Sequence, residues 1–264
     1  MSAIAARPVK RAWPIVAEQE LRDLWLAGRG LPLIFAYSLL LSVITYLVAT
    51  NTALNFLEQR ESVNLTLQVA VAAGSLLVLL GAADAISGER ERGTLESLLL
   101  SPASRLSLVV GKGIAALSIW VAAFLVAIPY ISFLGRGVGV VGLAIGNGLL
   151  VGVLLALFLA GLGLLMSALS GSNRFSLSVA LFVLLALFAP TQLPSGAQQS
   201  WVGDLLLRID PISSGLHYLG KVIVDGHSAG QELSWLIGPA VAAALATAGA
   251  LAASRWFNLR GGPS

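Results

Sequence analysis

Long apolar runs alternate with short polar stretches along the chain, and six of the runs are long enough for a membrane helix. A helix needs about 20 apolar residues to cross a hydrocarbon core that is roughly 30 Å thick. Membrane strands would be about 10 residues long and would alternate in polarity, and these runs do neither. The pattern therefore predicts an all-α integral membrane protein with six transmembrane helices, at about residues 31–50, 67–86, 108–131, 142–168, 176–193 and 234–256.

Composition agrees with this prediction and adds two exclusions. The chain of 264 residues is 57% hydrophobic and 11% charged, and its mean hydropathy of +0.87 excludes an ordinary soluble domain. The spans and their connections take up residues 1–264, so we expect a single transmembrane domain and no second globular domain. The absence of cysteine excludes disulfides and thiolate metal sites.

The distribution of Lys and Arg indicates the orientation. An even number of spans places both termini on one side, and only four of the 16 Lys and Arg residues fall on the other side: Arg60, Arg136, Arg208 and Lys221. This bias predicts that both termini and the polar loop 87–107 are cytoplasmic. Because the chain is rich in Ala, Leu and Gly, we expect a bacterial cytoplasmic (inner) membrane, with lipids as neighbours. The pI of 9.6 follows from the same bias and does not indicate nucleic-acid binding.

The loop between the second and third spans is a charged island that runs from Ser87 to Pro102. It contains four consecutive charges that we expect to lie in water: Glu89, Arg90, Glu91 and Arg92. Thr94 is a suitable N-cap, and three leucines follow it at helical spacing: Leu95, Leu98 and Leu99. The pattern predicts a short surface helix over 94–101 whose leucines face a partner, and Pro102 ends it.

Two further stretches are amphipathic but too short to span a membrane. Residues 13–29 mix apolar and charged side chains, which predicts a helix in the cytoplasmic headgroup layer with Trp25 as its interfacial anchor. Residues 194–233 separate the fifth and sixth spans, and Asp210-Pro211 marks a helix start within them. We expect an extracytoplasmic helical hairpin there.

The fourth span is rich in glycine. Gly142 and Gly146 are four residues apart, and so are Gly148 and Gly152. This spacing allows helix backbones to approach closely. The contact can lie within one subunit or at a seam between two.

Motifs for catalysis or metal binding are missing from the sequence. Gly111-Lys112 lacks the first glycine and the hydroxyl residue of a phosphate loop. His217 and His227 are ten residues apart in a helical segment, which is a weak signal for a metal site. We therefore expect a non-catalytic chain without a cofactor or metal of its own.

The spans carry no paired carboxylates of the kind that relay protons. Asp84 lies just before the charged island, where we expect it to pair with Arg90 or Arg92. A proton-driven carrier buries several ionisable groups in the middle of its spans. The chain therefore shows no energy source of its own.

The stretch from Asp84 to Lys112 carries a specific pattern. The residues from Gly88 to Pro102 read Gly-Glu-Arg-Glu-Arg-Gly-Thr-Leu-Glu-Ser-Leu-Leu-Leu-Ser-Pro, and Ser104-Arg105 and Gly111-Lys112 follow them. With six spans around it, this pattern resembles the ABC type-2 permease family, the membrane subunits of ATP-driven exporters. The resemblance covers essentially the whole chain. In chain length and loop sequence, this chain is most similar to the small stand-alone permeases of the nitrous-oxide-reductase maturation type.

The resemblance implies a mechanical function for the charged island. In the family, a coupling helix in this loop docks into a cleft of a separate cytoplasmic ATPase, which binds ATP and magnesium. Two permease chains, here a homodimer that meets through the first and fifth spans, would work with two ATPase chains. The residues that the resemblance assigns to ATPase coupling are Glu89, Arg90, Glu91, Arg92, Gly93, Thr94, Leu95, Glu96, Leu98 and Leu99.

Two other classes remain open at this point. A membrane anchor or scaffold could bind a cytoplasmic partner without transporting anything, and a secondary carrier is disfavoured by the uncharged spans. The side chains of the spans are mostly Leu, Ala, Val and Gly, which suits lipids, hydrophobic drugs or peptides as substrates.

Overall fold

The computed structural model describes residues 12–26, 29–50, 56–95, 100, 103–192 and 200–256, and within these residues the fold is all-α with no strand. Three short 3-10 helices, η1 (Ala189–Gln192), η2 (Leu233–Leu236) and η3 (Ser254–Trp256), join or extend the α-helices. The α-helices are α1 (Trp13–Trp25), α2 (Gly30–Ala49), α3 (Phe56–Asp84), α4 (Ser87–Glu91), α6 (Arg105–Leu134), α7 (Val141–Leu169), α8 (Asn173–Phe188), α10 (Trp201–Ile209), α11 (Pro211–Ile223) and α12 (Ile237–Ala253).

Six of these helices are long and apolar enough to cross a membrane, which confirms the predicted number: α2, α3, α6, α7, α8 with η1, and α12 with η2. One boundary differs from the expectation. The second span was expected to begin at about residue 67, whereas α3 begins at Phe56. Residues 56–66 include Glu58, Gln59, Arg60 and Glu61, which are good helix formers, so the helix continues beyond its apolar part.

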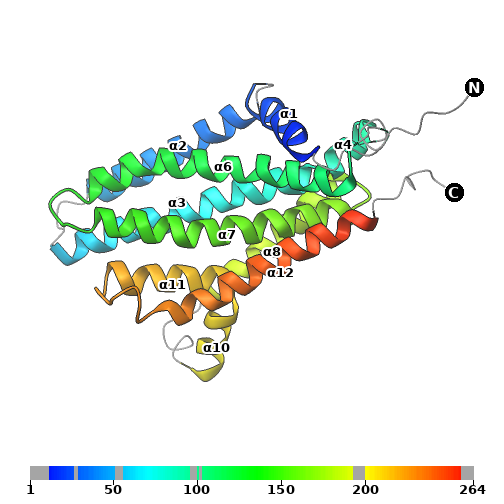
Figure 1. The fold of residues 1–264 in the computed structure, drawn as a ribbon. Coiled ribbons are helices and arrows are strands. Elements are labelled where there is room, and N and C mark those ends of the chain that lie inside the picture. Colours follow the sequence, from blue (N-terminus) through cyan, green and yellow to red (C-terminus); the bar gives the residue numbers. More distant parts are fainter. Residues whose placement is uncertain are drawn as a thin grey trace, which may run out of the picture.

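The long helices run side by side with α3 and α7 at the centre (Figure 1). α7 packs against both α3 and α12, and α6 covers another side of α3. α2 and α8 lie at the margin and bury the smallest share of their surface, whereas α7 buries the largest. The large apolar side chains that remain exposed on α2 and α8 include Phe35, Leu39, Phe182 and Leu185.

Glycines of α7 allow this close packing. A Cβ at Gly161 would lie 2.6 Å from the carbonyl carbon of Ala246 in α12, and a Cβ at Gly163 would lie 2.8 Å from the carbonyl oxygen of Leu79 in α3. Gly146, by contrast, has open space around it. Gly161 and Gly163 therefore serve helix contacts within the subunit.

α10 and α11 form the helical pair that the sequence predicts between the fifth and sixth spans; α10 lies beside the bundle, and α11 runs from there towards the end away from α4 (Figure 1). Asp210 ends α10 and caps α11, because its side chain accepts a hydrogen bond from the backbone N–H of Ser213 at 2.6 Å. Tyr218 in α11 donates to Oδ1 of Asn147 in α7 at 2.7 Å. The pair is thus packed onto the bundle.

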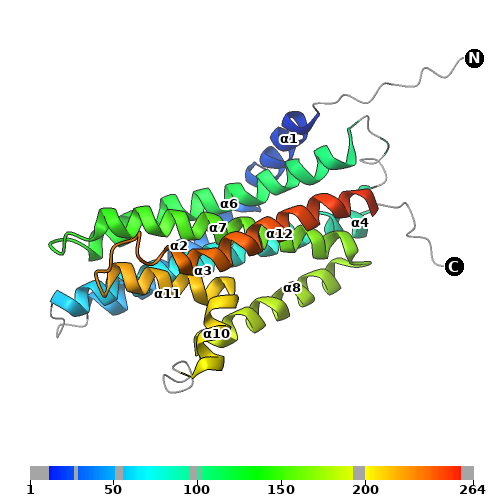
Figure 2. The ribbon, with the colours of Figure 1, turned by 60° about the horizontal axis from the view of Figure 1, so that its bottom comes forward.

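α1 lies at the end of the bundle where α4 and the carboxyl end of α12 are found, at an angle to the long helices (Figure 2). It packs on α6, where Val16 and Ala17 meet Gly111. The indole N–H of Trp25 donates to Oγ of Ser118 in α6 at 3.0 Å. Trp25 therefore also fixes α1 to α6, and its role as an interfacial anchor stays a prediction.

Candidate functional site

The short helix α4 is held against the bundle by hydrogen bonds at its start. The backbone N–H groups of Ile86 and Ser87 both donate to Oγ of Ser167 near the end of α7, at 3.0 and 2.8 Å. The hydroxyl of Ser87 donates to the carbonyl of Ala83 and to Oδ1 of Asn173. The first part of the charged island is consequently part of the bundle and moves with α3, α7 and α8.

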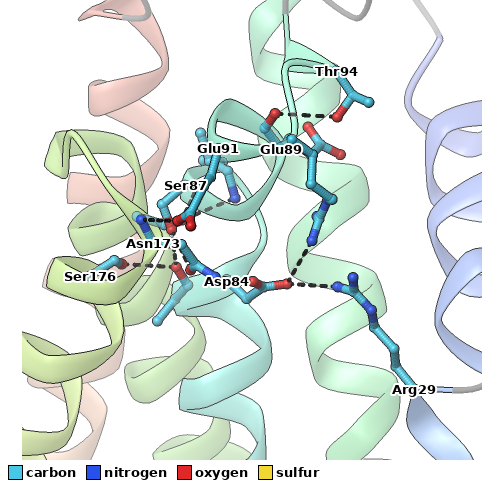
Figure 3. Close-up of polar contacts among 12 residues, drawn as sticks. Arg29, Asp84, Ser87, Glu89, Glu91, Thr94, Asn173 and Ser176 are labelled. Carbon is cyan, nitrogen blue, oxygen red and sulfur yellow. Dashed lines mark hydrogen bonds and ion pairs between the residues drawn. The ribbon is translucent and has the colours of Figure 1, made fainter.

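Asp84 is the centre of a polar cluster at the same place (Figure 3). One carboxylate oxygen accepts from Nη1 of Arg29 at 2.9 Å and lies 3.9 Å from Nη1 of Arg92. The other accepts from Nδ2 of Asn173 at 2.7 Å. The predicted pairing with Arg92 is confirmed, whereas Arg29, which precedes the first span, is a partner that the sequence did not indicate.

Arg90 does not pair with Asp84. Its guanidinium donates to the carbonyl oxygens of Ser170 and Ala168 at the carboxyl end of α7. These carbonyls have no partner inside the helix, and a cation there also interacts favourably with the helix dipole. Arg90 thus fastens α4 to the end of α7.

Glu89 faces the interior, which corrects the expectation that the four consecutive charges lie in water. Its carboxylate lies 2.5 Å from Nζ of Lys112 in α6, and Glu20 of α1 lies 2.6 Å from the same nitrogen. The side chain of Lys112 is only 3% exposed. A buried ammonium requires paired charges, so this lysine draws one carboxylate from α1 and one from α4.

Glu91 is also directed towards the bundle. Its carboxylate accepts from the backbone N–H of Asn173 at 3.1 Å, at the first turn of α8. An acidic side chain at a helix N-terminus satisfies a free N–H group and the helix dipole together. Glu89 and Glu91 thus tie the charged island to α6 and α8, and their role in ATPase coupling stays a prediction.

The remaining predicted coupling residues lie farther out. Gly93 has a φ of +71° and reverses the chain after α4. Thr94 is exposed and donates to the carbonyl of Glu89 at 3.3 Å, while Leu95 is half-buried against the core. The predicted residues Glu96, Leu98 and Leu99 lie outside the described residues.

A cavity of about 1050 Å³ opens beside these charges. Helices α1, α2, α3, α6 and α8 contribute to its wall, together with α4 and the residues that follow it. One part of the wall is charged and the other part is apolar. The charged side chains are Glu20, Asp23, Arg29, Asp84, Glu89, Arg92 and Lys112, and the large apolar ones are Leu24, Leu33, Leu80, Ile119, Leu177 and Leu181.

The two histidines lie at the opposite end of the bundle. Nδ1 of His227 lies 2.6 Å from Oε1 of Glu232, and the ring of His217 packs on Trp235 with centroids 4.1 Å apart. Burial lowers the pKa of His217, and the nearby Lys221 lowers it further. Within the part of the chain that the structure describes, no group of side chains is suited to hold a metal ion.

Lys112 and Glu20 are the functional candidates that sequence reasoning missed. In the sequence, Lys112 enters only a failed phosphate loop and the end of the family pattern, and Glu20 is one of several charged residues in 13–29. A usable signal was present, because Lys112 lies in an otherwise apolar run and such a lysine needs a carboxylate partner. The sequence could not say which carboxylate.

Two comparisons with known proteins bear on this arrangement. The sequence model of the family described as ABC-2 family transporter protein matches residues 16–256. The match covers all six long helices, most of α1 and the charged island. A search of the curated proteins found no match.

Proposed function

Because the chain belongs to the ABC-2 transporter family, we propose that it is the transmembrane permease subunit of an exporter that is driven by a separate ATPase. Members of this family are generally non-catalytic membrane subunits. The ATPase chain would bind ATP and magnesium and would dock on the charged island from the cytoplasm. The membrane would be the bacterial inner membrane, with both termini on the cytoplasmic side.

The observation that carries this proposal is the attachment of α4 to several spanning helices at once. α4 is bonded to α7 through Ser167 and Arg90 and to α8 through Asn173. It reaches α6 and α1 through Lys112. A displacement of the loop by a docked ATPase would therefore pull on four helices besides α3, which runs directly into it. Such a connection is suited to a coupling element that transmits the movement of an ATPase to the spanning helices.

The proposed assembly contains two permease chains and two ATPase chains. In the bundle, α2 and α8 are the least buried of the six long helices. A second copy that covers these two faces would bring the apolar side chains of α2 and α8 into contact, as the family resemblance implies. A closed symmetric pair is also the usual arrangement of identical subunits.

The docking role of the island is tested by Leu98→Asp, with co-purification of the ATPase as the readout. A leucine buried in a partner's cleft contributes roughly 1.5–3 kcal/mol, and a charge in its place would be desolvated without a partner. We expect Leu98→Asp to lose the ATPase while the chain still inserts into the membrane. Glu96→Ala should weaken the complex less, because an exposed ion pair contributes about 0–1 kcal/mol.

The matched control is Leu205→Asp on α10, which makes the same change at an exposed leucine outside the charged island. It should leave ATPase binding intact. If Leu98→Asp keeps the ATPase and Leu205→Asp releases it, both the docking site and the orientation are wrong. Tight, stoichiometric ATP hydrolysis by the isolated chain would refute the non-catalytic role.

A further inference from the structure

The large cavity has the amphipathic shape of a lipid site. Its charged side chains come from α1, from α4 and Arg92 after it, from Arg29 at the start of α2 and from the near ends of α3 and α6, and its apolar wall continues along the helices. Leu33 and Leu181 belong to that wall and lie on α2 and α8, the two helices with the most exposed apolar faces. The volume of about 1050 Å³ is at the upper end of the range for small-molecule sites.

The charges that the cavity presents are separated by sign. In the Asp84 cluster the guanidiniums of Arg29 and Arg92 are the exposed members, at 59% and 43%, while the carboxylate is 28% exposed. In the Lys112 cluster the order is reversed, because the ammonium is 3% exposed and the carboxylates of Glu20 and Glu89 are 20% and 13% exposed. A molecule entering the cavity therefore meets cations on one side and carboxylates on the other.

The carboxylate side also has unused hydrogen-bonding capacity. Oε2 of Glu89 is buried and has no hydrogen-bond partner among the described residues. Asp23, which lines the same cavity and is exposed, makes no ion pair with a described residue. An ammonium group in the cavity would pair with the exposed carboxylate of Asp23 and with the parts of Glu20 and Glu89 that remain accessible.

We propose that this cavity binds an aminophospholipid, a zwitterionic lipid whose head group carries a primary ammonium and a phosphate. The ammonium lies at Glu89 and Asp23, the phosphate at Arg29 and Arg92, and the acyl chains lie against the apolar wall that Leu33, Leu80 and Leu181 form. Binding does not depend on an ATPase. The further step, that this lipid class is what the exporter moves, rests on the proposed function.

Binding is measured on the purified full-length chain without any ATPase, by native mass spectrometry in detergent. The probes are three lipids with identical acyl chains: phosphatidylethanolamine, phosphatidylcholine and phosphatidylglycerol. The second lacks N–H donors on its ammonium, and the third lacks the ammonium. We expect phosphatidylethanolamine to bind about tenfold more tightly than either, because a hydrogen bond to a charged group contributes that much.

Variants separate the two sides of the head group. Arg29→Gln should weaken phosphatidylethanolamine and phosphatidylglycerol alike, because both carry the phosphate. Glu89→Gln should weaken phosphatidylethanolamine alone, and Asp23→Asn should act in the same direction without disturbing an ion pair of the fold. The matched controls, Arg174→Gln and Glu18→Gln, remove like charges outside the cavity and should change nothing.

Equal binding of the three lipids overturns the proposal, and so does a loss that the control variants reproduce. Tight binding of a zwitterionic dipeptide in place of the lipid would assign the cavity to another ligand class. Thermal unfolding of each variant is recorded alongside. If Glu89→Gln lowers stability, the effect of Asp23→Asn on phosphatidylethanolamine binding is the test of the ammonium site. The lipid-binding experiment contains no ATPase, so its failure would not bear on the docking role of Leu98. Likewise, if Leu98→Asp still binds the ATPase, the lipid-binding proposal is unaffected.

Discussion

Nζ of Lys112 lies 2.6 Å from Oε1 of Glu20, and this contact joins α6 to the helix that precedes the first span. The same ammonium binds Glu89, so one buried lysine connects α1, α4 and α6. Two carboxylates share a single cation there. The stability of this end of the bundle should therefore depend on Lys112 more than on either glutamate.

We expect Lys112→Met to lower the free energy of unfolding by about 3–5 kcal/mol, because removing one partner of a buried ion pair leaves an uncompensated charge. Glu20→Gln should cost less, since Glu89 remains to pair with the lysine. Thermal unfolding in detergent measures both. Arg22→Gln, which breaks an exposed ion pair with Glu18, serves as the control and should cost about 0–1 kcal/mol. A Lys112→Met chain as stable as the control would contradict the prediction.

Two identical substitutions in α7 should have opposite effects. Gly161→Ala places a Cβ 2.6 Å from the backbone of α12, so the two helices must separate, at a cost of about 1–3 kcal/mol. Gly146→Ala meets open space and should stabilise the helix by about 0.5–1 kcal/mol. Unfolding midpoints of the two variants check this order. If Gly161→Ala is as stable as Gly146→Ala, the packing of α7 on α12 is wrong.

The contact of His217 with Trp235 should weaken in acid. Burial holds the pKa of His217 below its ordinary value, and Lys221 and Arg208 lower it while Glu232 and Asp225 raise it. A group with a lowered pKa contributes stability that is present above its ordinary pKa of about 6.5 and is lost as the pH falls through the lowered value. The protection of α11 amides against hydrogen exchange, taken relative to the intrinsic exchange rate at each pH, should therefore fall on acidification.

His217→Phe is the test of this assignment, because it keeps a ring against Trp235 and removes the titrating group. The variant should show less acid dependence of exchange in α11 than the natural chain. An unchanged acid response in His217→Phe would assign the effect to another group, such as the His227–Glu232 pair.

Crosslinking tests the proposed dimer. Leu39→Cys in α2 and Phe182→Cys in α8 place thiols on the two exposed faces, and the natural chain has no cysteine to interfere. We expect the double variant to form a covalent dimer under mild oxidation. Leu125→Cys with Leu245→Cys, on the exposed faces of α6 and α12, is the matched pair that should stay monomeric. Crosslinks that form only with the second pair would contradict this prediction and would place the dimer interface on α6 and α12.

The sequence by itself determined the six spans, the helix before them and the helical pair between the fifth and sixth, because each depends on local length, hydropathy and capping. Asp210 illustrates this, since its N-cap role on α11 follows from its position before Pro211. The pattern from Asp84 to Lys112 was likewise enough to indicate the family. The surface helix over 94–101 stays a prediction of the sequence.

Only the tertiary structure decided which charges meet. Glu20 and Glu89 are far from Lys112 in the sequence, and Arg29 is far from Asp84, so their pairing depends on which helices pack side by side. The sequence indicates that a lysine in an apolar run needs a carboxylate partner, but it contains several carboxylates and does not indicate which of them is the partner. The packing of α1 and α4 against α6 selected two of them, because burial of the ammonium is favourable only where carboxylates are already close.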